Sequence, residues 1–233
     1  MIRQALLDCF FPRFCIACQQ PIFKKSPTYL CENCFKKIVF NRGSCCYHCG
    51  RAMGTERDSI CMNCTELKPY FKEGIALFAY NAVERSFIHA LKYHYGSYLK
   101  KDLYLLLEHE LDRLKALKSA IFVPVPLHFL RQWKRGYNQS EWIAKALQRC
   151  CGGEILSLLK RKVNTPSQTS LTRSERKKNV ENAFTLAKKT IDPEKTYVLV
   201  DDVFTTGATL NACAKVLHEK GAQNIRVFTL AHG

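Results

Sequence analysis

Eight cysteines in the first third of the chain form four C-x-x-C pairs, a spacing typical of metal ligands. The pairs are Cys15/Cys18, Cys31/Cys34, Cys46/Cys49 and Cys61/Cys64. Each pair lets one tight turn aim two thiolates at one ion, and two such turns supply the four ligands of a tetrahedral zinc site. We therefore predict structural zinc, because an all-thiolate ligand set leaves no coordination position open for a substrate.

The spacing leaves the pairing of these turns open. Twelve residues separate the two pairs of the first half and eleven separate those of the second, close to the spacing of zinc-ribbon hairpins. Sequential pairing gives two ribbons, whereas a crossed pairing joins the first pair to the third and the second to the fourth. One zinc ion or two, Cys45 in place of Cys46, and a redox role for a C-x-x-C pair are also compatible with the sequence.

A second chemical motif follows an apolar run that begins at Val198. Two carboxylates end this run, and a loop of hydroxyl groups and one glycine then leads into a predicted helix. Such a loop and helix N-terminus suit a phosphate dianion, and adjacent carboxylates accept hydrogen bonds from two vicinal hydroxyls of a sugar. A threonine-rich capping turn with an incidental acidic pair is the structural alternative. The residues predicted to bind a ribose 5′-phosphate are Asp201, Asp202, Thr205, Thr206, Gly207, Ala208 and Thr209.

The positive charge of the chain is concentrated in its middle. Lys and Arg number 36 against 20 Asp and Glu, which gives a net charge of +16. Residues 128–178 hold 12 basic and 3 acidic residues, a net charge of +9, whereas residues 1–73 contribute +5. A charge this far from neutral indicates an anionic partner. Arginines in segments rich in Gly, Asn, Ser and Thr favour phosphate contacts, and a solvated helix face is the alternative for the scattered lysines.

Composition and segment lengths narrow the class of protein. Hydrophobic residues make up 47% and charged residues 24% of 233 residues, which is ordinary globular chemistry and excludes wholesale disorder. No apolar run approaches the roughly 20 residues of a membrane-spanning helix, and residues 1–15 lack the features of a signal peptide. We therefore expect a cytoplasmic protein without membrane insertion, in which clustered cysteines bind metal.

Strand and helix patterns alternate after about residue 74. Strands are predicted at 75–80, 121–125, 196–203 and 225–230, and helices around 87–91, over 99–114 as one long helix, at 142–150 and at 210–217. This alternation predicts an α/β fold with a mostly parallel sheet flanked by helices. We expect a Cys-rich zinc-ribbon domain over 1–70 and the α/β domain over 71–233. The acidic pair then lies at the carboxyl end of a strand, where open α/β sheets bind ligands.

The segment VLVDDVFTTGATL (198–210) resembles the phosphoribosyl pyrophosphate (PRPP) motif of type I phosphoribosyltransferases. The segment PVPLHFLRQWKRGYNQS (124–140), the T-x-x-Q-x-x-L-x-x-x-x-R-x-x-N run from Thr165 to Asn179 and the four cysteine pairs resemble the ComF family. That family is associated with DNA uptake in natural transformation. The resemblance covers essentially the whole chain and implies a type I phosphoribosyltransferase-like fold behind a double zinc ribbon.

The resemblance also assigns roles by position. It implies that Asp201 and Asp202 hold the ribose hydroxyls of PRPP, with Mg²⁺, and that residues 205–209 hold the 5′-phosphate. It places a pyrophosphate site at the turn after strand 121–125 and a flexible loop at 161–179; the candidates there are Arg131, Arg135, Arg161 and Arg176. Lys92 and Tyr93 match a lysine–aromatic pair of the family, with a solvated helix end as the alternative. His232 stands where the family carries a stronger cation.

Three functions remain open on the sequence. The first is a competence factor that handles incoming single-stranded DNA in the cytoplasm beside a PRPP pocket, with PRPP, single-stranded DNA and other competence proteins as partners. Its candidate DNA-binding residues are Lys134, Arg135, Lys162, Arg173, Lys177 and Lys178, with Trp133, Tyr137 and Trp142 interleaved as stacking faces. The second is a phosphoribosyltransferase of nucleotide salvage, against which stands the lack of a recognisable base-binding hood. The third is a PRPP or nucleotide sensor that acts through a protein partner. We favour the first.

Overall fold

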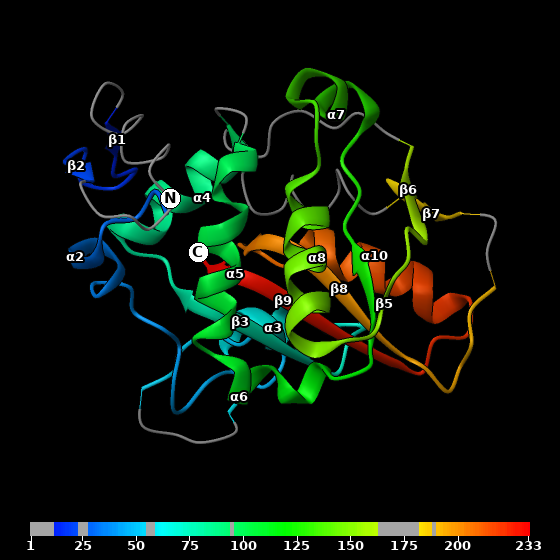
Figure 1. The fold of residues 1–233 in the computed structure, drawn as a ribbon. Helices are drawn as coiled ribbons and strands as arrows, with labels where there is room; N and C mark the ends of the chain where they lie inside the picture. Colours follow the sequence, from blue (N-terminus) through cyan, green and yellow to red (C-terminus); the bar gives the residue numbers. More distant parts are fainter. Residues whose placement is uncertain (1–11, 23–27, 55–58, 94–95, 163–181, 188–189) are drawn as a thin grey trace.

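The computed structural model describes residues 12–22, 28–54, 59–93, 96–162, 182–187 and 190–233 (Figure 1). Its centre is a parallel sheet with the strand order β3-β9-β8-β4-β5. These strands are β3 (Glu73–Ala79), β4 (Ile121–Pro124), β5 (Glu154–Ile155), β8 (Thr196–Phe204) and β9 (Asn224–His232). The predicted α/β class with a parallel sheet is confirmed.

Two small antiparallel pairs stand outside this sheet. β1 (Arg13–Phe14) pairs with β2 (Pro21–Ile22) around the first C-x-x-C turn. β6 (Leu159–Arg161) pairs with β7 (Phe184–Leu186), so two strands that the sequence did not predict flank residues 163–181.

Helices cover both faces of the sheet. The longer helices are α4 (Ala82–Lys92), α5 (Lys100–Glu108), α8 (Gln139–Cys151) and α10 (Ala208–Glu219), and the short ones are α2 (Glu32–Phe35), α3 (Met62–Leu67), α6 (Leu111–Leu114), α7 (Phe129–Arg135) and the 3₁₀ turns η1 (Gly96–Leu99) and η2 (Lys115–Leu117). Figure 1 shows α5 and α8 in front of the central strands. No helix in the described ranges is both long enough and apolar enough to cross a membrane.

The prediction of one long helix over 99–114 is wrong. Helix α5 ends at Glu108, and α6 begins at Leu111 after Glu110 adopts φ −121° and ψ 26°. The buried carboxylate of Glu110 forms ion pairs with Arg42 from the cysteine-rich region and with Arg113. The leucine spacing continues through this break, where Glu110 pairs with Arg42, a residue 68 positions away in the chain.

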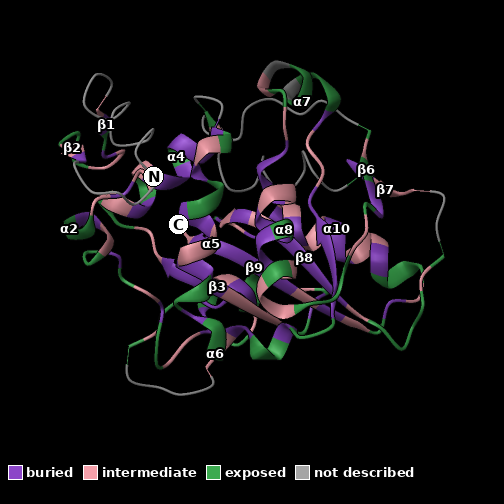
Figure 2. Cartoon of the chain, in the orientation of Figure 1, coloured by how far each residue is buried: buried purple, intermediate pink, exposed green. Residues whose placement is uncertain are grey.

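The sheet separates two hydrophobic cores, because successive strand side chains point to opposite faces. Val198 and Val200 of β8 pack with helices α4, α5 and α8, and this core also contains Cys15 and Cys34. Tyr197 and Leu199 pack with α10 in a second core that contains the buried cysteines 46, 49, 61 and 64. The buried residues follow the central strands in Figure 2. The two cysteine-rich segments therefore join the cores of opposite sheet faces.

Candidate ligand-binding cavity and metal centres

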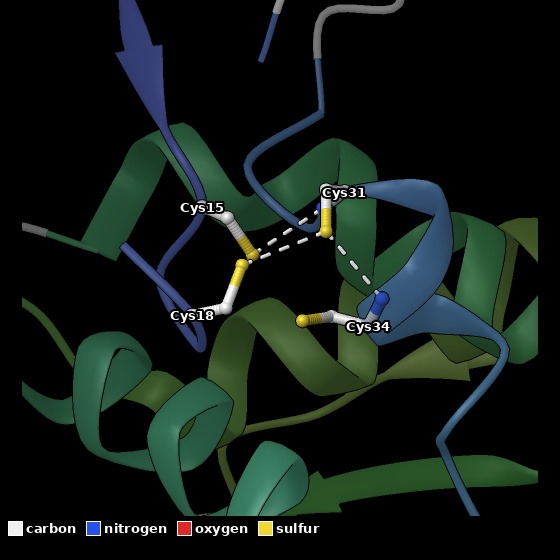
Figure 3. Close-up of side chains that lie close together, drawn as sticks. All are labelled: Cys15, Cys18, Cys31 and Cys34. Carbon is white, nitrogen blue, oxygen red and sulfur yellow. Dashed lines mark hydrogen bonds between the residues drawn. The ribbon is translucent and has the colours of Figure 1, made fainter. Parts of the chain in front are cut away.

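The eight predicted metal ligands form two separate groups of four. The Sγ atoms of Cys15, Cys18, Cys31 and Cys34, hereafter the first cysteine group, lie within 4.8 Å of one another (Figure 3). Those of Cys46, Cys49, Cys61 and Cys64, the second cysteine group, do the same. The structure thus adopts the sequential pairing and excludes the crossed one. In the part of the chain that the structure describes, Cys46 and not Cys45 joins the second group.

The local geometry of both groups fits zinc. In the first group, the N–H of Gln19 donates to the carbonyl of Cys15 (2.9 Å), and in the second the N–H of Gly50 donates to that of Cys46 (2.9 Å). Backbone N–H groups also point at sulfur, from Cys31 to Cys15 Sγ (3.4 Å) and from Cys61 to Cys46 Sγ (3.3 Å). Such donors stabilise thiolates, and four thiolates complete the tetrahedral shell of a structural zinc ion.

The predicted phosphate-binding residues gather at the carboxyl ends of β4 and β8. A cavity of about 290 Å³ opens there, and Asp201, Asp202, Thr205, Gly207, Ala208 and Thr209 line it. Thr206 does not line it: its Oγ1 accepts from the N–H of Ala208 (3.4 Å), and its carbonyl accepts from Asn63 Nδ2 (3.5 Å). The contiguous motif and its position at a strand end explain why most of these residues line one cavity, while their predicted role in binding phosphate stays a prediction.

A lysine that lies far away in the sequence completes the acidic pair. Lys92 Nζ, at the end of α4, lies 3.1 Å from Asp202 Oδ1, and its side chain is 28% exposed. Burial works against the ammonium, but the charges of Asp202 and Asp201 prevail and raise the pKa of Lys92. The alternative of a solvated helix end for Lys92 is therefore wrong.

The two carboxylates have different surroundings. Asp201 Oδ1 accepts hydrogen bonds from Ser140 Oγ (3.1 Å) and from the N–H of Asp202 (2.9 Å). Burial, followed by the neighbouring charge of Asp202, raises the pKa of Asp201 to about 7. Asp202 Oδ2 is buried and has no hydrogen-bond partner among the described residues. A buried acceptor in this state is costly unless a ligand donates to it.

The phosphate loop (residues 205–209) rests on the second cysteine-rich segment. Gly207 begins α10 at φ +76°, and a Cβ there would lie 2.3 Å from Phe204 Cζ and 2.7 Å from Leu67 Cδ2. Only glycine fits both the left-handed conformation and this contact. Leu67 belongs to α3, which begins directly after the zinc ligand Cys61. The sequence carries no signal for this contact, since 140 positions separate the two residues.

Comparisons with known proteins agree with this arrangement. A family model described as a double zinc ribbon domain matches residues 6–65, and one described as a phosphoribosyl transferase domain matches residues 113–233. Competence protein F of Haemophilus influenzae (strain ATCC 51907 / DSM 11121 / KW20 / Rd) is 32% identical, over 95% of this chain and 98% of that protein. The chain belongs to the ComF family.

Further relatives carry related names. Competence protein ComFC of Streptococcus pneumoniae (strain ATCC BAA-255 / R6) is 31% identical over 90% of each chain. DNA utilization protein YhgH of Salmonella typhi is 30% identical over 94% of this chain and 96% of that protein. The similarity to both relatives thus spans the zinc ribbons and the phosphoribosyltransferase part together.

Only some of the basic residues that the sequence predicts to bind pyrophosphate or DNA lie among the described residues. Arg135 and Arg161 line the cavity. Arg135 also lies over the ring of Tyr93, 5.4 Å from its centre, while Lys162 is exposed and its N–H donates to the carbonyl of Ala183 (2.8 Å). Arg131 and Lys134 belong to α7, but their side chains are not described. Arg173, Arg176, Lys177 and Lys178 lie outside the described residues, so their predicted roles stay predictions.

Two of the three interleaved aromatic residues are not free to stack on a ligand. Tyr137 and Trp142 stack on each other, with ring centres 4.1 Å apart and planes 11° apart. The hydroxyl of Tyr137 donates to the carbonyl of Leu91 (2.9 Å), and Lys100 Nζ lies 4.9 Å from the Trp142 ring centre. Both side chains thus hold α8 against its neighbours. Trp133, by contrast, is 86% exposed.

Proposed function

We propose that this ComF protein handles single-stranded DNA that enters the cytoplasm during natural transformation, and that its cavity binds PRPP together with Mg²⁺. The names of the relatives, competence proteins and a DNA utilization protein, support the DNA part of the proposal. The match to the phosphoribosyl transferase domain supports the PRPP part.

The observation that carries the PRPP proposal is the buried Oδ2 of Asp202, which has no hydrogen-bond partner among the described residues and belongs to a side chain that lines the cavity. A ribose hydroxyl is a donor of the right kind to satisfy this oxygen. Thr205, Thr209 and the start of α10 supply hydroxyl and backbone donors for a 5′-phosphate at the same cavity. Arg135 and Arg161 supply positive charge for a pyrophosphate group.

Lys92 makes the acidic pair compatible with a polyanionic ligand. Two adjacent carboxylates repel phosphate oxygens, and the ammonium 3.1 Å from Asp202 offsets one of these charges. The oxygen ligands of the cavity suit Mg²⁺, which Asp201 and Asp202 would approach while the ligand's own phosphate oxygens hold most of it. When bound, Mg²⁺ neutralises charge on the pyrophosphate group.

Calorimetric titration of PRPP with and without Mg²⁺ tests this pocket. Asp202→Asn keeps the side-chain volume but removes the charged acceptor, so affinity should fall about 10- to 150-fold, the range for a hydrogen bond to a charged group. Asp112→Asn is the matched control, because its carboxylate is 92% exposed on α6. Equal PRPP binding by Asp202→Asn and the parent protein would show the ribose assignment to be wrong.

Nucleotide salvage is a second candidate, favoured by the intact acidic pair beside Lys92 in the cavity. It predicts that free purine or pyrimidine bases release pyrophosphate from PRPP in the presence of the purified protein. We expect no such release, and sustained turnover with any free base would replace the DNA-handling proposal with the salvage one.

Binding of a single-stranded oligonucleotide and its duplex at several salt concentrations tests the DNA part. The single strand should bind more tightly, since the proposal includes stacking on unpaired bases. The logarithm of its affinity should fall with the logarithm of salt concentration by about 0.7 for each phosphate contact. No binding, or binding that ignores salt, would contradict the proposed role of the basic residues.

A further inference from the structure

Helix α7 (Phe129–Arg135) exposes three large apolar side chains on one face. Phe129 is 67% exposed, Leu130 44% and Trp133 86%. Positions i, i+1 and i+4 of a helix share one side, so these three residues form a continuous apolar surface, hereafter the α7 face. Tryptophan is on average a highly buried residue, and contiguous exposed apolar side chains of this kind are typical of interaction sites.

Hydrogen bonds hold both ends of the helix, while the three exposed apolar side chains lie on its outer face. At its start, the buried imidazole of His128 accepts from the N–H of Leu130 (3.3 Å). At its end, Gly136 takes φ +78° and its N–H donates to the carbonyl of Gln132 (2.7 Å). The amide of Asn138 then donates to the carbonyl of Val125 at the end of β4 (3.0 Å). These contacts fix the position of helix α7, which lies at the top of the molecule in Figure 1.

Residues on both sides of α7 line the PRPP cavity. Pro126 and Leu127 precede the helix, and Arg135 and Gln139 follow the α7 face; all four border the cavity. Tyr93, which is 50% exposed, lies under the guanidinium of Arg135 at the same border. A ligand on the α7 face therefore lies next to the proposed PRPP site.

The positive charge around α7 indicates that a ligand of the α7 face carries negative charge. No Asp or Glu occurs from residue 113 to residue 140, and three of the seven α7 residues are Arg or Lys. An apolar aromatic face within basic surroundings complements a chain that carries both flat rings and negative charges. Single-stranded nucleic acid has this composition, whereas in a duplex the base faces are already stacked on one another.

We propose that the α7 face is a base-stacking platform for single-stranded nucleic acid, with Trp133 as its principal contact. This inference rests on the proposed DNA-handling function and gives it a location. Bases stack on Trp133 and Phe129, and the positive charge of α7 attracts the phosphates. Since Tyr137 and Trp142 stack on each other, the α7 face carries the aromatic contribution that the sequence had spread over three residues.

The test compares Trp133→Ala with a matched control. Tyr70→Ala removes another partly exposed aromatic side chain, which follows α3 and does not line the proposed PRPP cavity. Loss of one stacked base should lower the affinity for a 20-nucleotide oligo(dT) by about 5- to 150-fold in Trp133→Ala. The salt dependence should stay unchanged because no phosphate contact is lost. An abasic oligomer of equal length should bind both variants and the parent equally. Zinc content and thermal midpoint should match the parent, since Trp133 is 86% exposed.

Fluorescence supplies a second, direct measurement. The chain has two tryptophans, so Trp142→Phe leaves Trp133 as the only one. Oligo(dT) should quench its emission and the abasic oligomer should not. Anionic phospholipid vesicles should leave the emission unchanged; a blue shift with vesicles and no response to oligo(dT) would make α7 a membrane contact instead.

The outcomes separate this inference from the function on which it rests. If the parent protein binds oligo(dT) and Trp133→Ala binds it equally well, the platform is wrong while the DNA-handling function stands. If the parent binds no single-stranded DNA, both are wrong.

Discussion

The two cysteine groups share one ligand pattern but are integrated into the molecule in different ways. In the second group all four cysteines are buried, whereas in the first Cys18 is exposed and Cys31 half-buried. The second segment packs directly on the sheet: a Cβ on Gly50 would lie 2.2 Å from the backbone nitrogen of Ala76 in β3. The first segment is attached at its cysteine turn by the buried carboxylate of Asp102, which accepts from the N–H groups of Tyr29 and Leu30 (both 3.0 Å).

This difference shows that equal motifs need not have equal roles. The second cysteine group belongs to a hydrophobic core, and helix α3, which follows Cys61, contacts the phosphate loop through Leu67. The first cysteine group lies on the other side of the sheet and has no described contact with that loop. The second ribbon thus packs against the loop that lines the cavity, and the first packs on the opposite face of the sheet, with α4, α5 and α8.

The largest expected effect comes from removing one ligand of each group. Cys64→Ser should lose one zinc ion, the folded core and PRPP binding, because structural zinc contributes on the order of 10 kcal/mol to folding. Cys18→Ser should also lose one zinc ion but keep PRPP affinity within about twofold. Zinc analysis, thermal unfolding and PRPP titration of both variants measure this. Equal loss of PRPP binding in the two variants would remove the distinction between the ribbons.

Asp102→Ala should detach the first segment without disturbing the cavity. The substitution leaves the N–H groups of Tyr29 and Leu30 unsatisfied, at a cost of about 1–3 kcal/mol for each buried donor. Hydrogen exchange should accelerate in residues 28–38 and stay slow in β8 and β9, while PRPP affinity is unchanged. Asp112→Asn serves again as the exposed control. Faster exchange across the whole sheet would mean that the first segment is as central as the second.

The free energy of unfolding should depend on pH through the carboxyl group of Asp102. Burial raises the pKa of Asp102 to about 6, against the N–H groups of Leu30 and Tyr29, which lower it. The folded protein therefore binds this proton more tightly than the unfolded chain, whose Asp pKa is near 3.9. The resulting stabilisation is present below about pH 4 and is lost as the pH rises through about 6.

Asp102→Asn cannot ionise, so it should lack this component. The free energy of unfolding of the variant minus that of the parent should therefore increase by roughly 1–3 kcal/mol as the pH rises from about 4 to about 7. Urea unfolding of both proteins at matched pH values measures the difference, and the pairwise comparison cancels the effect of acid on the zinc thiolates. A difference that does not change with pH would contradict the raised pKa.

The smallest expected effect concerns the support of the phosphate loop. Leu67→Ala keeps both cysteine groups but removes the contact behind Gly207 and Phe204, so PRPP affinity should fall about two- to fivefold, as for a partly buried apolar contact of ~1 kcal/mol or less. Titration and zinc analysis measure it, and Met62→Ala is the control on the same helix because Met62 is 79% exposed. An unchanged PRPP affinity in Leu67→Ala would show that the second ribbon does not support the cavity.

Several features of this protein follow from the sequence because they are local. A C-x-x-C turn aims two thiolates with its own four residues, and the acidic pair, phosphate loop and helix start are contiguous from Asp201 onward. Alternating strand and helix patterns likewise predicted a parallel sheet, since each pattern reports the burial of its own segment. For that reason the sequence alone could predict the cysteine metal ligands, the fold class and most of the loop residues after Asp202 that line the cavity.

Tertiary structure decided the features that join distant segments. The sequential pairing of the cysteines, the break at Glu110, the pair between Lys92 and Asp202 and the contact between Leu67 and Gly207 each depend on which faces pack together. The exposure of Trp133 and the mutual stacking of Tyr137 and Trp142 are of the same kind. The sequence of a segment shows which side chains are apolar or charged, and its periodicity indicates which face is buried. Only the packing of the sheet, helices and ribbons determines which partner each side chain contacts.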